Sequence, residues 1–158
     1  VRVLLLVAIV VSLFLVVPAS AARGQSQEAT WFRVTADNGE YLDLDADGAA
    51  DDIVTTLSIH ILCPVCFDHT DVYCYLCLPS GDAYLFIVTI IGTYTHIEMD
   101  VGWYNVVTDS GWYTFIAYTE IDCGCTSYWS LDSLTFDPPT EGNPGPPVVG
   151  VLSLTVTL

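Results

Sequence analysis

The chain has 158 residues, which is enough for one domain of ordinary size. Asp and Glu number 19 against three Lys and Arg, and the resulting net charge of −16 argues against nucleic acid as a partner, because phosphates would be repelled. The hydrophobic fraction of 53% is too high for an intrinsically disordered chain, so the composition predicts a folded domain.

The first 22 residues have the pattern of a cleavable signal peptide with an apolar helix. Arg2 is a short positive region, Val3–Val17 is an uninterrupted apolar run, and residues 18–22 include small residues that suit a signal peptidase. The run is shorter than the roughly 20 residues that span a bilayer, so we expect no stable membrane span in the mature chain. The alternative is a pilin-like filament subunit that retains this helix, against which Pro18 argues. The pattern predicts a secreted, extracellular or cell-surface protein.

The most informative segment is an acidic loop at residues 43–52. Carboxylates at every second residue converge when the chain coils tightly, and Gly48 permits the sharp turn. Hard oxygen ligands at this spacing favour Ca²⁺ over softer metals. The predicted ligands are the side chains of Asp43, Asp45, Asp47 and Asp51 and the carbonyl of Ala49, with Asp52 either adding a ligand or supporting the others. The alternative is a solvated acidic turn, whose carboxylates would repel each other strongly without a cation.

The pattern D-x-D-x-D-G-x-x-D resembles the calcium loops of EF-hands, dockerins, thrombospondin type 3 repeats and the FG-GAP or VCBS repeats of secreted proteins. The chain departs from the EF-hand because Val54 stands where that loop has its twelfth-position Glu. The residues that follow, 53–62, are rich in β-branched side chains and predict a strand rather than a helix. The resemblance therefore implies a calcium loop in an extracellular β protein.

Residues 23–137 predict an all-β domain. Strand patterns cover residues 31–36, 53–63, 72–78, 83–91, 94–101, 112–121 and 128–136, with a further candidate at 103–107. No amphipathic helix is evident after the first 22 residues. About seven to eight short strands separated by turns indicate an antiparallel β-sandwich.

A short motif before one predicted strand supports this fold. Asp109, Gly111 and Tyr113 resemble the D-x-G-x-Y stretch that opens strand F of immunoglobulin-like domains, in which the Tyr hydroxyl bonds to the backbone of the corner. Phe115 stands where antibody domains have the strand-F cysteine, so no such inter-sheet disulfide is expected. The resemblance implies an Ig-like or fibronectin-like sandwich of a prokaryotic surface protein. The alternative is a chance turn before a strand.

Six cysteines in an exported chain predict disulfides. In an antiparallel hairpin centred on Thr70, Cys63 would lie opposite Cys77 and Cys66 opposite Cys74. The rival interpretation is a metal site with these four thiolates as ligands. Cys123 and Cys125 could bond to each other, reach the hairpin or stay reduced.

No catalytic motif is evident, so we predict that the chain is not an enzyme. The aromatic residues Trp103, Tyr104 and Trp112 are candidates for a face that stacks on sugar rings, which would make the chain a carbohydrate-binding module. Packing in the core is the simpler explanation of these side chains.

The C-terminal part divides into a Pro/Gly-rich linker at residues 138–147 and an alternating strand pattern at residues 148–158. This strand either completes its own sandwich or is added to a neighbour. Together the patterns predict a secreted, calcium-stabilised structural or adhesion module of a cell surface or extracellular assembly. Its expected partner is a protein or a second copy bound through the C-terminal strand, with a glycan as the alternative.

Overall fold

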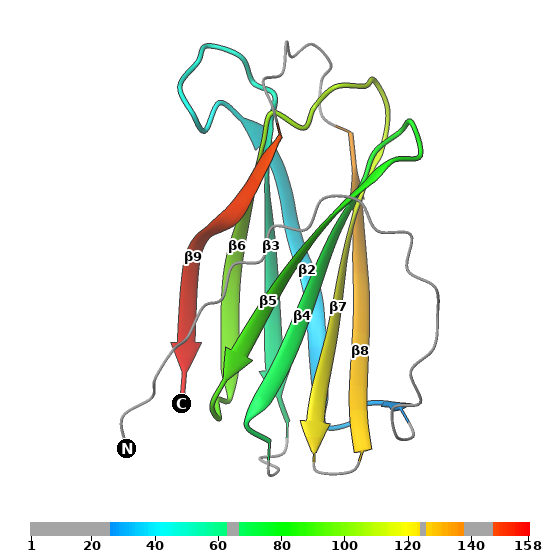
Figure 1. Cartoon of the computed structure of the whole chain (residues 1–158), viewed down its shortest axis with the longest axis vertical. Coiled ribbons are helices and arrows are strands. Elements are labelled where there is room, and N and C mark those ends of the chain that lie inside the picture. The colour runs from blue at the N-terminus through cyan, green and yellow to red at the C-terminus, as the bar shows by residue number, and fades with distance from the viewer. Residues whose placement is uncertain (1–25, 63–66, 124–125, 138–146) are drawn as a thin grey trace.

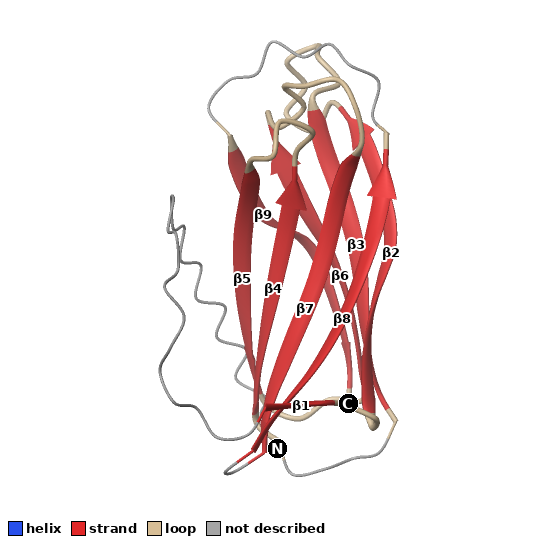
Figure 2. Ribbon diagram, turned by 90° about the vertical axis from the view of Figure 1, so that its right-hand side faces the viewer, coloured by secondary structure: helices blue, strands red, loops and turns tan. Residues whose placement is uncertain are grey.

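The computed structural model describes residues 26–62, 67–123, 126–137 and 147–158, which form a β-sandwich of two packed sheets (Figures 1 and 2). The predicted signal peptide and nearly all of the predicted linker lie outside these residues. The strands within them are β1 (Ser26–Glu28), β2 (Phe32–Leu42), β3 (Asp52–Ile61), β4 (His69–Cys77), β5 (Ala83–Ile91), β6 (His96–Tyr104), β7 (Tyr113–Cys123), β8 (Thr126–Phe136) and β9 (Val148–Thr157).

The strands are arranged in a five-stranded sheet with the order β1-β8-β7-β4-β5 and a four-stranded sheet with the order β2-β3-β6-β9. Every pairing between the eight longer strands is antiparallel, and only the three-residue β1 runs parallel to its neighbour β8. The predicted all-β class and two-sheet sandwich are confirmed. The arrangement is compatible with an immunoglobulin-like fold.

The core lies between the two sheets and is built by the period-two alternation of the strands. Inward-facing residues of β4, β5 and β7 meet those of β3 and β6, and the largest buried side chains include Trp103, Tyr113 and Phe115. The indole nitrogen of Trp103 donates a hydrogen bond of 2.9 Å to the hydroxyl of Thr55, so the one polar atom of this ring is satisfied inside the core.

One seam between the sheets is closed by side chains of β8. The backbone nitrogen of Val34 on β2 donates to the hydroxyl of Ser130 at 3.1 Å, and that of Ala36 donates to Asp132 Oδ2 at 3.1 Å. Because these donors lie on the unpaired side of edge strand β2, the contacts block pairing with another chain there.

The C-terminal strand β9 completes the four-stranded sheet of its own domain. It pairs with β6 from Tyr104↔Val148 to His96↔Thr157, and its apolar side chains Val149, Val151, Leu154 and Val156 pack against the core. The register shifts between Asp100 and Val101, which leaves Leu152 as the extra residue of a bulge. In this structure the first of the two arrangements predicted for the segment is present.

Candidate metal centre

The acidic loop joins β2 to β3 at one end of the sandwich, where Figure 1 shows it in cyan at the top. Two residues of the loop have left-handed backbone conformations, Ala46 with φ of 59° and Gly48 with φ of 94°. Glycine has no Cβ and adopts such angles without strain, so Gly48 is the residue on which the turn depends. The sequence therefore coils the loop back toward its own start, as the aspartate spacing predicts.

Three carboxylates of the loop lie close enough to share a cation. Asp43, Asp45 and Asp52 each offer an oxygen, and these oxygens lie within 4.8 Å of one another. Calcium takes oxygen ligands at about 2.3–2.6 Å, so two ligands on opposite sides of the ion are roughly 4.6–5.2 Å apart. The spacing thus fits one calcium coordination sphere.

Backbone amides hold the carboxylates of the turn in place. Asp43 accepts hydrogen bonds of 3.0 Å from the nitrogens of both Asp47 and Gly48 through its two oxygens. Asp47 in turn accepts a bond of 2.7 Å from the nitrogen of Ala49. These bonds fix the rotamers of both side chains before any ligand arrives, which lowers the ordering cost of binding.

Asp52 connects the loop to the segment that follows β6. Its side chain is buried, and its Oδ1 accepts a hydrogen bond of 2.7 Å from the backbone nitrogen of Asn105. Its Oδ2 accepts from the nitrogens of Leu44 and Asp45. A cation held by Asp52 would therefore stabilise two loops that are about fifty residues apart in the sequence.

The neighbouring Asp51 is a buried carboxylate beside the cluster. Its exposed fraction is 0%, and neither of its carboxylate oxygens has a hydrogen-bond partner. Burial and the negative charges of Asp47, Asp52 and Asp45 raise the pKa of this carboxyl, so its ionised form is disfavoured. Its backbone carbonyl is fixed by the nitrogens of Val106 and Val107 at 3.0 and 2.9 Å. A divalent ion near Asp51 would offset both the burial of the carboxylate and the repulsion by the neighbouring aspartates, which are the two causes of the raised pKa.

The residues predicted as metal ligands have different positions in the loop. Asp43, Asp45 and Asp52 form the close cluster, whereas Asp51 lies buried beside it and Asp47 shapes the turn. No contact identifies the Ala49 carbonyl as a ligand. Sequence reasoning missed Asn105, which has a φ of 57° and donates its backbone N–H to Asp52. The tolerance of Asn for left-handed angles was the only signal for it.

The predicted tyrosine corner has a short hydrogen-bonded ring. The hydroxyl of Tyr113 donates to the carbonyl of Asp109 at 3.0 Å and lies 3.1 Å from the nitrogen of the same residue, from which it accepts. Gly111 has φ of 128° and packs on Pro79, and Phe115 is fully buried in the core. These contacts secure the start of β7 next to the loop that holds Asn105.

The hairpin predicted from the cysteine spacing is not formed. Thr70 lies inside β4, whose neighbours are β5 and β7. Cys74 and Cys77 are free thiols, and because they are three residues apart on one strand their side chains lie on opposite faces of the sheet. They therefore cannot both be ligands of one metal ion. The partners predicted for them, Cys63 and Cys66, and also Cys125 lie outside the described residues.

The prediction that Trp103 lies on a sugar-binding face is wrong. Trp103 is fully buried and bonded to Thr55, so it belongs to the core. Trp112 is 64% exposed on the loop before β7, and Tyr104 is half-buried at the end of β6. The three side chains thus do not form one exposed platform.

Comparisons with protein-family models, with curated proteins and with solved structures found no match to this chain. Among the described residues there is no helix that is long and apolar enough to cross a membrane.

Proposed function

We propose that the chain is a calcium-stabilised β-sandwich module of a cell surface or extracellular assembly, with a structural or adhesion role rather than a catalytic one. The supporting observation is the buried, unpartnered carboxylate of Asp51 beside the cluster of Asp43, Asp45 and Asp52. A buried charge without a partner is costly, and a cation at the loop removes that cost.

The proposed role of the ion is to join two loops at one end of the sandwich. Asp52 links the acidic loop to Asn105, and Asp51 links it to Val106 and Val107 through its carbonyl. Calcium bound to these carboxylates would hold the β2–β3 and β6–β7 connections together without adding a reactive group. Such a site suits a protein that must keep its shape outside the cell.

Export and extracellular placement are proposals that rest on residues 1–22 and on the strongly acidic composition. An extracellular location suits the proposed calcium site, because extracellular modules commonly bind calcium with dissociation constants of about 10⁻⁴–10⁻³ M.

Thermal melting tests the calcium proposal. The full chain is expressed in a secreting host, recovered from the medium and melted in EDTA, in Ca²⁺ and in Mg²⁺. A hundredfold excess of calcium over the dissociation constant stabilises the folded state by about 2.7 kcal/mol. We expect this gain with Ca²⁺ in the wild type and its loss in Asp45→Ala. An identical melting temperature in EDTA and in calcium for the wild type would refute the site.

A further inference from the structure

Two of the three histidines in the chain lie next to each other on the outer face of the four-stranded sheet. His60 on β3 is paired in register with His96 on β6. Ile59 and Ile97, their neighbours along these strands, are fully buried in the core. Because side chains alternate along a strand, both imidazoles project from the opposite, outer face. His60 is exposed there and His96 is half-buried. We name these two residues the histidine pair.

The imidazole rings of the histidine pair are in contact. Their centroids are 4.3 Å apart, and the interplanar angle is 33°. The register explains this proximity, because the nitrogen of Ile61 donates to the carbonyl of Thr95 at 2.9 Å and makes the adjacent pair the hydrogen-bonded one. The histidines therefore occupy a non-hydrogen-bonded position, where antiparallel side chains are closest. The backbone of two neighbouring strands thus sets the separation of the rings.

The separation of the rings matches two adjacent ligands of one metal ion. Imidazole nitrogen binds such ions at about 2.0–2.1 Å, which places each ring centroid about 3.2 Å from the metal. Two rings bound at a right angle then have centroids roughly 4.5 Å apart, and at the tetrahedral angle roughly 5.2 Å apart. The observed 4.3 Å is closer to the right angle. Nitrogen ligands at right angles are typical of tetragonal Cu²⁺ and Ni²⁺.

The rings can turn toward a shared ion without a change in the strands. Rotation about the Cβ–Cγ bond moves the ring nitrogens and leaves the centroid nearly in place. The Nδ1 atom of His96 is buried and has no hydrogen-bond partner among the described residues, so no bond through this atom fixes the ring. A buried nitrogen without a partner is also costly, and rotation of the ring removes this atom from its buried position.

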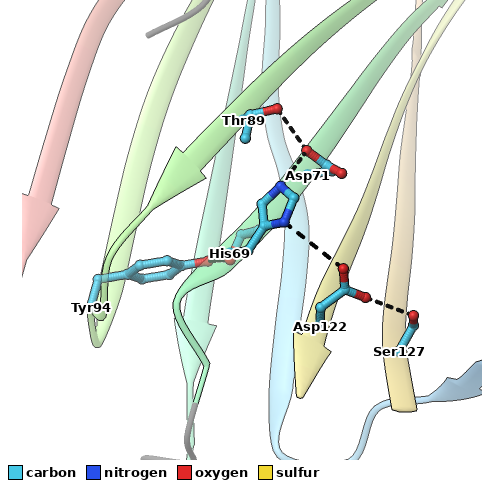
Figure 3. Close-up of polar contacts among 7 residues, drawn as sticks. His69, Asp71, Thr89, Tyr94, Asp122 and Ser127 are labelled. Atoms are coloured by element: carbon cyan, nitrogen blue, oxygen red, sulfur yellow. Dashed lines mark hydrogen bonds and ion pairs between the residues drawn. The ribbon is translucent and has the colours of Figure 1, made fainter. Parts of the chain in front are cut away.

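The third histidine lies in a different environment. Both nitrogens of His69 face carboxylates, with Nε2 3.2 Å from Asp71 and Nδ1 3.9 Å from Asp122 (Figure 3). Thr89 and Ser127 donate to these carboxylates at 2.7 Å. His69 therefore has acidic partners where the histidine pair has a second imidazole. A single imidazole binds a late transition metal more weakly than two, which makes His69 the matched control.

Charges of both signs lie near the histidine pair. Arg33 on β2 is exposed and paired in register with His60, and the exposed Glu98 lies two residues from His96 on the same face. Across the surface in water, a guanidinium at this distance should weaken the binding of a divalent cation only about twofold. The net charge of −16 attracts a cation and repels an anion. The surroundings therefore favour a cation at this position.

We propose that His60 and His96 bind one divalent late transition metal ion, with Cu²⁺ and Ni²⁺ preferred and water completing the coordination sphere. One ring nitrogen from each strand holds the ion, which links β3 to β6 on the outside of the sheet. Dedicated sites have three or four protein ligands, so we expect a weaker, micromolar affinity from two. The site lies about 27 Å along β3 from Asp52 and does not depend on the calcium proposal.

Calorimetric titration of the full chain with Ni²⁺ at neutral pH tests the site, because Ni²⁺ does not oxidise thiols as Cu²⁺ does. Exposed thiols are alkylated first, and saturating calcium occupies the acidic loop. His60→Gln and His96→Gln should each weaken binding about tenfold or more, since the second ligand acts at high effective concentration. His69→Gln should leave the affinity unchanged. Arg33→Gln should strengthen it about twofold, because it removes a nearby positive charge.

Nuclear magnetic resonance of the wild type gives a test that needs no variant. Paramagnetic Ni²⁺ should broaden the imidazole signals of His60 and His96 at concentrations that leave those of His69 sharp. The broadening should disappear at about pH 5, because protons compete with the metal for the ring nitrogens. Circular dichroism identifies any variant that fails to fold.

A wild type that binds neither Ni²⁺ nor Cu²⁺ overturns the proposal, and the contact of the two rings is then cross-strand packing alone. Equal Ni²⁺ affinity of the wild type and His60→Gln also overturns it. Loss of binding in His69→Gln would assign the ion to that residue and its carboxylates. Sulfate that binds the wild type but not Arg33→Gln, in a chain indifferent to Ni²⁺, would indicate an anion site instead. Asp45→Ala should keep the Ni²⁺ affinity, so the two metal proposals can fail separately.

Discussion

Replacing Asp51 by Asn should change the stability of the protein in opposite directions with and without calcium. The side chain has 0% exposure, its oxygens have no hydrogen-bond partner, and three neighbouring aspartates add negative charge. Asn has nearly the same shape and removes only the charge. In EDTA the substitution therefore removes a penalty, whereas in calcium it removes a negative charge beside the proposed cation.

The expected magnitude follows from the cost of a buried polar group without a partner, which is about 1–3 kcal/mol and more for a charged one. Because Asn keeps part of that cost, we expect a gain of about 2 kcal/mol in EDTA. For a domain of this size that is roughly 6–12 °C in melting temperature. The calcium-dependent gain, about 2.7 kcal/mol in the wild type at a hundredfold excess, should fall by more than half.

The pH dependence gives the same substitution a second readout. A carboxyl whose pKa is raised by folding destabilises the folded state when it is ionised, so the penalty is absent below the ordinary carboxyl pKa and complete above the raised one. In EDTA the wild type should therefore lose stability as the pH rises through that interval. Asp51→Asn should lack this part of the profile, and the difference between the two melting curves isolates it.

Asp37→Asn is the matched control, because Asp37 is exposed on β2 outside the acidic loop and the substitution changes the net charge equally. It should leave both melting temperatures nearly unchanged. If Asp51→Asn lowers the melting temperature in EDTA and keeps the full response to calcium, Asp51 does not face the cation and the reasoning fails.

Other predictions concern the framework. Tyr113→Phe removes the hydroxyl that bonds to the Asp109 backbone and should cost about 0.5–1.5 kcal/mol, measured by urea unfolding; no change would show that the corner is not stabilising. Burial raises the pKa of the Cys74 thiol well above its usual range, so this thiol should react with a thiol reagent only on unfolding. The half-buried Cys77 should react faster. Mass mapping that finds Cys74 labelled first would contradict the structure. Deleting residues 148–158 exposes core side chains that β9 covers and should lower the melting temperature of the monomer; an unchanged value would make the strand dispensable.

Most of the strand positions could be predicted, because alternation and turn residues are local signals. The expected strand at residues 83–91 has the same bounds as β5, and those at 53–63 and 128–136 differ from β3 and β8 by a few residues. The expectation failed for β2, where Asp37, Asn38 and Gly39 look like a turn. Asp37 is the extra residue of a bulge inside a continuous strand, and the pairing of Asn38 and Gly39 with β3 outweighs their low strand propensity.

The candidate metal site could be predicted as a segment but not in its internal arrangement. The aspartate spacing identifies the loop, since it needs only local coiling. Which of Asp51 and Asp52 enters the cluster depends on the segment around Asn105, more than fifty residues further along the chain. The cysteine hairpin failed for a similar reason, because symmetric spacing around Thr70 contains no information that β4 pairs with β5 and β7 instead.

The inward face of β5 could not be predicted, because alternation reveals a face only when one side of a strand is polar. In β5 the inward-facing residues Phe86, Val88 and Ile90 alternate with Leu85 and Ile87, so the sequence reads as apolar on both sides. Such strands are typical of sheets that are covered on both faces. In the structure Phe86, Val88 and Ile90 are buried, whereas Leu85 and Ile87 are half-buried. Which of the two sets faces the core depends on how β5 pairs with β4 and how both strands lie over the second sheet, and neither is a local signal.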